Sequence, residues 1–255
     1  MIDVNVSLFH WPFRRLPNDS TDQLVAKLTA AGITQAWTGT FEAVLHEDSD
    51  GVNRRLVEEC RKKGEGILIP FGCVNPTLPD WKEDVRRCKV EYLMPGVRLY
   101  PNYHDYTLES DLFADVLKEC HRHKLIVQIS LRMEDVRTQH PLVQVPDVDV
   151  QPLLKLLPKF PDLKIVLINA QRSVRGPLVT QLTEAGQLFY DIAMLEGIGG
   201  VGKFIQDVPY QRVLLGSHFP FFYLESSLLK LKESDLGDTI RSAIAEENAQ
   251  TLITE

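Results

Sequence analysis

The chain has 255 residues, of which 44% are hydrophobic and 25% are charged, and its formal net charge is −7. An acidic balance without a basic run argues against nucleic acid and against an anionic membrane surface as partners. No apolar run approaches the roughly 20 residues that a membrane-spanning helix needs. The length suits one α/β barrel, which usually takes about 250 residues.

The N-terminus and the cysteines both favour a cytoplasmic protein. Residues 1–4 lack the basic and long apolar regions of a signal peptide. The cysteines are scattered without a Cys-x-x-Cys pair, which indicates buried reduced thiols and argues against a zinc site made of them. They are Cys60, Cys73, Cys88 and Cys120.

Strand-like and helix-like runs alternate along the whole chain. Short apolar runs predict strands at residues 2–6, 33–37, 66–74, 96–101, 125–131, 163–168, 187–192 and 212–216. Helical spacing predicts helices after the capping-box pattern of residues 20–23, at 52–60, 81–88, 108–120 and 153–157, from Pro177 onward, and at 198–206, 224–231 and 240–252.

Eight units of strand and helix, with strands that are apolar throughout, indicate a parallel sheet covered by helices. Closure into a single (β/α)8 TIM barrel over residues 1–255 is the simplest arrangement. A doubly wound open sheet is the alternative, but the chain lacks a dinucleotide-binding fingerprint. In a barrel the chemistry lies where strands end. The eighth strand delivers His218 to that rim, whereas His121 and His123 end a helix on the opposite face.

Several motifs together resemble one known family. They are Gly-Val-Arg-Leu-Tyr-Pro at 96–101, Pro-x-Leu-Lys-Ile-Val-Leu at 161–167, Leu-Leu-Gly-Ser-His-Phe-Pro-Phe at 214–221 and Glu-Asn-Ala-x-x-Leu at 247–252. The pattern is similar to the amidohydrolase-related family, whose members are TIM-barrel hydrolases, lactonases and decarboxylases of the metal-dependent-hydrolase type.

The chain departs from that family where the family binds metal. The first-strand pattern Asp-x-His-x-His is Asp3-Val4-Asn5-Val6-Ser7 here. Strands five and six of the family end in histidine, whereas residues 128–131 and 167–170 hold none, and the strand-eight aspartate is His218. Asn and Ser are weak ligands for zinc. We therefore expect a degenerate metal site and no metal cofactor.

The loop after the fifth strand is the densest group of catalytic residue types. It contains Arg132, Glu134, Asp135, Arg137 and His140. A solvated salt-bridge loop is one interpretation. The other is that Asp135 and His140 take part in catalysis and Arg132 binds substrate, since long loops on a rigid scaffold often carry function.

Four more side chains complete the predicted site around His218, which we expect to act as general acid or base. Arg98 interrupts an apolar strand and suits a clamp on a substrate carboxylate or phosphate, or else an internal salt bridge, for example with Asp3. Asn5 and Asn169 could polarise a carbonyl oxygen. Arg172 follows Asn169 and is expected to bind substrate.

These residues predict a hydrolase that cleaves a lactone, ester or amide bond in a small anionic substrate without a metal. One alternative is a displaced metal site made of His140, His218 and Asp135. Another is a non-catalytic binding barrel. A homo-oligomer is compatible with all three hypotheses.

Overall fold

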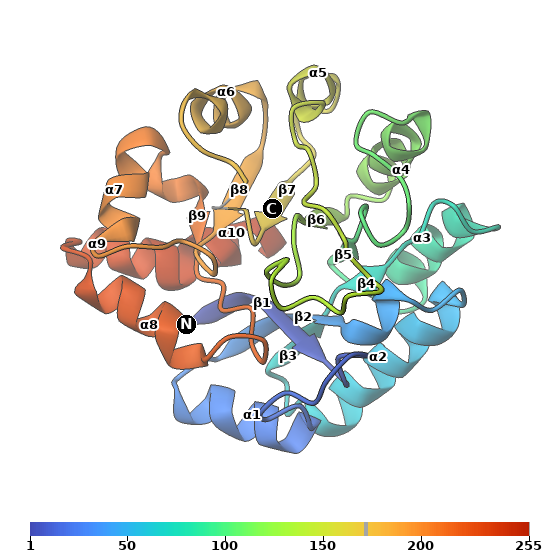
Figure 1. Ribbon diagram of the computed structural model, residues 1–255, viewed down its shortest axis with the longest axis horizontal. Helices are drawn as coiled ribbons and strands as arrows, with labels where there is room; N and C mark the ends of the chain where they lie inside the picture. The colour runs from blue at the N-terminus through green and yellow to red at the C-terminus, as the bar shows by residue number, and fades with distance from the viewer. Residues whose placement is uncertain (171–172, 255) are drawn as a thin grey trace.

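The computed structural model describes residues 1–170 and 173–254, and its described strands pair in parallel around a central axis. Helices ring the strands (Figure 1). The strands are β1 (Ile2–Leu8), β2 (Gln35–Thr40), β3 (Leu68–Pro70), β4 (Gly72–Cys73), β5 (Gly96–Leu99), β6 (Ile126–Ser130), β7 (Ile165–Ile168), β8 (Leu188–Asp191) and β9 (Val213–Leu214).

The strands form a closed (β/α)8 barrel, which confirms the predicted fold. β3 and β4 are two parts of the one strand expected at 66–74, and the interruption falls at Phe71, directly after Pro70. The first and last strands meet, since Val4 N–H donates to Leu215 O at 2.9 Å and Ser7 N–H to Phe219 O at 3.0 Å. These two bonds exclude an open sheet.

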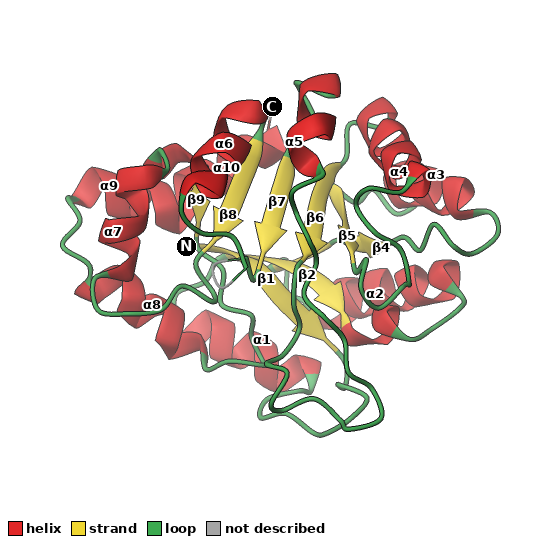
Figure 2. Cartoon of the chain, turned by 45° about the horizontal axis from the view of Figure 1, so that its top comes forward, coloured by secondary structure: helices red, strands yellow, loops and turns green. Residues whose placement is uncertain are grey.

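The helices cover the outer surface of the barrel (Figure 2). They are α1 (Thr21–Ala30), α2 (Ser49–Lys63), α3 (Trp81–Val90), α4 (Asp111–Arg122), α5 (Leu153–Leu156), α6 (Pro177–Ala185), α7 (Gly200–Asp207), α8 (Leu224–Glu233), α9 (Asp238–Ser242) and α10 (Asn248–Thr254). Short 3₁₀ turns occupy Phe41–Val44, Leu157–Lys159 and Tyr210–Arg212, and a π turn, Ala243–Glu247, joins α9 to α10.

The structure confirms the predicted start of α6 and the predicted state of the cysteines. Pro177 is the first residue of α6, and all four cysteines are buried and free. Ser20 does precede α1, but its side chain makes no capping bond, so the predicted capping box is wrong in that detail. No helix in the described part of the chain is long and apolar enough to cross a membrane.

Side chains alternate across each strand, and this alternation positions the site. On β6, Val127 and Ile129 point outward into the main core against the helices. Ile126 belongs to a second apolar cluster inside the barrel, which Leu252 of α10 helps to close at the amino ends of the strands. Gln128 and Ser130 are buried polar residues on the inner face. The barrel interior is thus apolar at one end and polar at the carboxyl ends, where a site is expected.

Candidate functional site

Asn5 joins polar residues from three strands at the carboxyl end of the barrel. Its Nδ2 donates to Asn169 Oδ1 at 2.9 Å and to Asp191 Oδ2 at 2.7 Å, and its backbone N–H donates to Asp3 Oδ1 at 3.0 Å. We call Asp3, Asn5, Asn169, Asp191, Ser217 and His218 the mouth cluster. All six are at most 2% exposed. The predicted convergence of Asn5, Asn169 and His218 is therefore observed.

His218 uses both ring nitrogens within the protein. Nε2 lies 2.7 Å from Met133 O, which can only accept, so Nε2 carries the proton and Nδ1 accepts from Asn169 Nδ2 at 3.3 Å. Burial lowers the pKa of His218 to about 4, which keeps the ring neutral near neutral pH. The ring stacks on Phe221 with centroids 4.8 Å apart. In this arrangement His218 positions its neighbours and holds no free nitrogen for a substrate.

The two carboxyl groups of the mouth cluster retain protons more readily than ordinary aspartates. Burial raises the pKa of Asp3 and of Asp191 to about 6 each. Asp3 accepts hydrogen bonds from the Ser217 N–H and hydroxyl, which lower its pKa only in part. Between these groups, Asn5 Oδ1 is buried and has no hydrogen-bond partner among residues 1–170 and 173–254. A buried polar oxygen of this kind normally binds an ordered water or an ion.

Arg98 lies inside the barrel, 1% exposed, and its donors go to protein acceptors. Nε donates to Gln128 Oε1 at 2.8 Å and Nη2 to Trp37 O at 3.1 Å, while Nη1 donates to Val6 O at 2.9 Å and to Ser7 Oγ at 3.2 Å. No ion pair with a carboxylate is found for it in the described residues, so the internal salt bridge with Asp3 is not formed. Burial lowers the pKa of Arg98.

The long loop after β6 crosses in front of the strands (Figure 1) and consists largely of ion pairs. Arg132 binds Asp147 through both Nε and Nη2, and Asp135 binds Arg137. His140 is exposed and stacks on Phe13 at 6.0 Å, so it is not joined to the buried His218. Arg172 lies outside the described residues.

A cavity of about 1000 Å³ opens beside the mouth cluster, between the loops after β1, β6, β8 and β9. We call it the rim cleft. Phe221 separates it from the mouth cluster, since this ring stacks on His218 and also lines the cleft. Its lining includes Arg14, Arg132, Glu134, Phe221, Phe222 and Tyr223.

Three residues of this region were not singled out from the sequence. Asp191 is the last residue of β8. A polar residue at the carboxyl end of a barrel strand is the signal that indicated His218, and the same signal could have indicated Asp191. Arg14 lies in the long loop after β1 and forms an ion pair with the buried Glu134. Phe221 is the last residue of the strand-eight motif, in which the sequence indicated only His218 as a site residue.

The whole chain matches known proteins at the level of family and fold. A family model described as amidohydrolase matches residues 2–253. The chain belongs to the amidohydrolase family. No curated protein sequence matches it significantly.

Solved structures of the same fold share little sequence with this family member. A 2,6-dihydroxybenzoate decarboxylase from Rhizobium is 14% identical with a TM-score of 0.74, over 99% of this chain and 97% of that chain. A dihydroxybenzoic acid decarboxylase from Polaromonas, with bound manganese and the inhibitor 2-nitroresorcinol, is 14% identical with a TM-score of 0.78, over 99% and 96%.

A third similar structure also contains manganese. It is a 5-carboxyvanillate decarboxylase from Novosphingobium aromaticivorans with 4-hydroxy-3-methoxy-5-nitrobenzoic acid, 12% identical with a TM-score of 0.77, over 100% of this chain and 96% of that chain. The manganese in these two decarboxylases contradicts the expectation that no metal cofactor is involved, because proteins of similar fold are crystallised with a metal.

Proposed function

We propose that this amidohydrolase is an enzyme that acts on a small aromatic carboxylate bound in the rim cleft. The observation that carries the proposal is the combination of aromatic and cationic side chains in one cavity. Phe221, Phe222 and Tyr223 offer ring faces, while Arg14 and Arg132 supply guanidinium groups. Aromatic rings stack on such faces, and guanidinium groups suit bidentate recognition of a carboxylate.

Arg14 is the better candidate for the carboxylate-binding residue. Its Nη1 pairs with Glu134, and its guanidinium lies 5.4 Å from the centre of the Phe221 ring. Its other N–H groups have no hydrogen-bond acceptor among the described residues and can bind a ligand, and 42% of the side chain is exposed. Arg132 donates two hydrogen bonds to Asp147, which fix its position, so it contributes positive charge and part of the cleft lining.

The reaction we propose is loss of CO₂ from the ring, as catalysed by the decarboxylases of similar fold. When the ring–carboxylate bond breaks, its electron pair stays on the ring carbon, which must then take a proton. Since Phe221 separates Asp191 and the rest of the mouth cluster from the rim cleft, we propose that this proton comes from water in the cleft. Hydrolysis of a lactone, ester or amide is the second candidate, favoured by the family description.

The mouth cluster also offers oxygen donors for a metal. Asp3, Asp191 and Asn5 Oδ1, which accepts no hydrogen bond from the described residues, form an oxygen set of the kind preferred by manganese or magnesium, and we propose that they hold a divalent cation. A cation held there would supply Lewis-acid polarisation to a substrate oxygen that reached past Phe221 into the mouth cluster. Within the described residues no group of three or more His, Cys, Asp or Glu could hold a metal, so the displaced site of His140, His218 and Asp135 has no support.

The test is an assay of the purified protein with 2,6-dihydroxybenzoate and 5-carboxyvanillate, with manganese or with a chelator, and with separation of the ring products. We expect turnover that manganese restores after chelation. Binding of 2-nitroresorcinol and of benzoate, measured by calorimetry, should weaken about tenfold in Arg14→Met. Arg54→Met, an exposed change on α2, is the matched control. Absence of both turnover and saturable binding of aromatic carboxylates refutes the proposal.

A further inference from the structure

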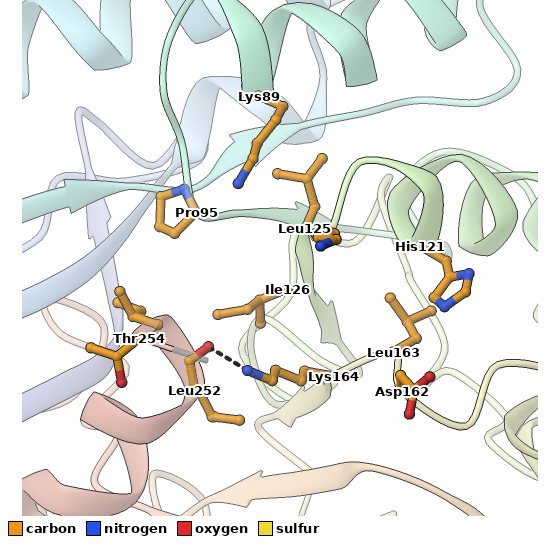
Figure 3. Close-up of a pocket in the computed structure, with 12 residues that line it drawn as sticks. Lys89, Pro95, His121, Leu125, Ile126, Asp162, Leu163, Lys164, Leu252 and Thr254 are labelled. Atoms are coloured by element: carbon orange, nitrogen blue, oxygen red, sulfur yellow. Dashed lines mark hydrogen bonds between the residues drawn. The ribbon is translucent and has the colours of Figure 1, made fainter.

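A second cavity lies at the opposite end of the barrel from the mouth cluster. It has a volume of about 560 Å³ and is shown in Figure 3. Pro95, Leu125 and Lys164 line it, and they directly precede β5, β6 and β7. Leu252 of α10 closes one side. We call this cavity the basal pocket, and none of its lining residues belongs to the mouth cluster or to the rim cleft.

The basal pocket is positively charged on an acidic protein. Among the described residues, three lysines, Lys89, Lys124 and Lys164, line it together with His121, and Asp162 supplies the one carboxylate of that lining. The formal charge of the lining is therefore +2 with histidine neutral, whereas the whole chain carries −7. In the part of the chain that the structure describes, neither Lys89 nor Lys124 has a carboxylate within ion-pair distance. Such a local excess of positive charge attracts anions.

The pocket also has an apolar floor. Leu125, Ile126 and Leu163 are buried side chains that line it, and Figure 3 shows Lys89 extending from above toward Pro95 and Ile126. Lys164 runs along the floor, and its Nζ donates to Leu252 O at 3.0 Å. The pocket thus presents ammonium groups at its edge and hydrocarbon at its base.

Helix-end electrostatics explains only part of this arrangement. Lys89 lies in the last turn of α3 and His121 in the last turn of α4, where cations oppose the helix dipole. That role requires neither Lys124, which lies beyond α4, nor a cavity with an apolar base. The convergence of lysines from three segments on one cavity is better explained by a ligand.

We propose that the basal pocket binds a small organic phosphate monoester. The phosphate dianion would lie between Lys89 and Lys124, and the apolar body of the ester would rest on Leu125 and Ile126. Lysine binds phosphate as a point charge, and the lining holds no arginine fork that would favour a planar carboxylate. The proposal is independent of the reaction proposed for the rim cleft, because the two sites share no residue.

Phenyl phosphate is the probe, titrated into the whole protein by calorimetry. We expect saturable binding that weakens about tenfold or more in the double variant Lys89→Met/Lys124→Met. Lys82→Met/Lys118→Met is the matched control, since it removes the same charge from the exposed surfaces of α3 and α4. Inorganic phosphate should bind more weakly than phenyl phosphate because it cannot use the apolar floor.

A second measurement needs no variant. Phenyl phosphate should shift the amide NMR signals of Leu125 and Ile126 and leave those of the mouth cluster unchanged. Three results would each overturn the proposal: no saturable binding, equal binding by the two double variants, or inorganic phosphate binding as tightly as the ester. None of them bears on turnover of aromatic carboxylates, so failure here is distinct from failure of the proposed function.

Discussion

Replacing Arg98 by methionine should destabilise the protein, because the guanidinium donates hydrogen bonds to buried acceptors inside the barrel. Gln128 Oε1, Val6 O and Trp37 O would lose donors now at 2.8, 2.9 and 3.1 Å. A buried acceptor left unsatisfied costs about 1–3 kcal/mol. Removing a buried charge recovers part of that loss. We therefore expect the free energy of unfolding to fall by about 3 kcal/mol.

Guanidinium unfolding followed by tryptophan fluorescence measures this loss. Arg54→Met on α2 is the control, since its exposed pair with Asp50 at 3.4 Å should contribute less than about 1 kcal/mol. If Arg98→Met were as stable as the control and bound aromatic carboxylates more weakly, Arg98 would be a substrate clamp and the structural interpretation would be refuted.

Gly39 gives the same prediction an independent check. A Cβ at this position would lie 2.7 Å from Arg98 Nη1 and 2.9 Å from Cζ, so glycine is required by the close approach of the guanidinium. Gly39→Ala should cost about 1–3 kcal/mol through overpacking. In the Arg98→Met background the cost should fall by at least about 0.5 kcal/mol. Equal costs in both backgrounds would show that the guanidinium does not fill this space.

Three further outcomes are expected. His218→Gln should have a lower free energy of unfolding than the parent at neutral pH. This difference should narrow as pH falls from about 6.5 toward 4, because in that range the histidine is protonated in the unfolded chain but not in the native protein, where its pKa is about 4. A difference that stays constant in pH-dependent unfolding would contradict the assigned burial. Manganese should raise the melting temperature of the parent and not of Asp191→Asn; an equal rise in both places the metal elsewhere. Asn248→Leu should lose about 1–3 kcal/mol in chemical unfolding, since Asn248 Nδ2 bonds Tyr210 O and Val213 O at 2.7 and 2.8 Å, and unchanged stability would contradict that role.

The fold was predictable because most barrel strands are buried on both faces and several of them, such as β6 and β7, are largely apolar in sequence. The run at 125–131 corresponds to β6 at Ile126–Ser130, and Pro177 marked the start of α6 correctly. The failures concern hydrogen bonds that tertiary structure decides. The run at 66–74 gave no sign that the strand would be interrupted at Phe71, and the Ser20 hydroxyl makes no capping bond despite its favourable sequence.

The site was predictable only as far as strand ends predict convergence. Asn5 lies within β1, Asn169 directly follows β7 and His218 follows β9, and the three side chains meet at the carboxyl end of the barrel as expected. The direction and partners of each side chain could not be read from sequence. The sequence around Arg98 is the same whether its side chain points toward the mouth of the barrel or across the interior. The direction is decided by hydrogen-bond acceptors on other strands, Gln128 Oε1 and Trp37 O. His140 belongs to a long loop whose course no periodicity fixes.

The mouth cluster concentrates features that lower stability, and this concentration favours a functional site over a drifted scaffold. Asp3 and Asp191 are buried carboxyl groups with raised pKa values, and no described residue donates a hydrogen bond to Asn5 Oδ1. Asn169 and His218 both adopt left-handed backbone conformations, with φ of 61° and 58°, which non-glycine residues rarely do. Apolar side chains could fill this volume at lower cost. Unfavourable groups gathered at the carboxyl end of a barrel are the pattern expected where binding or catalysis requires them.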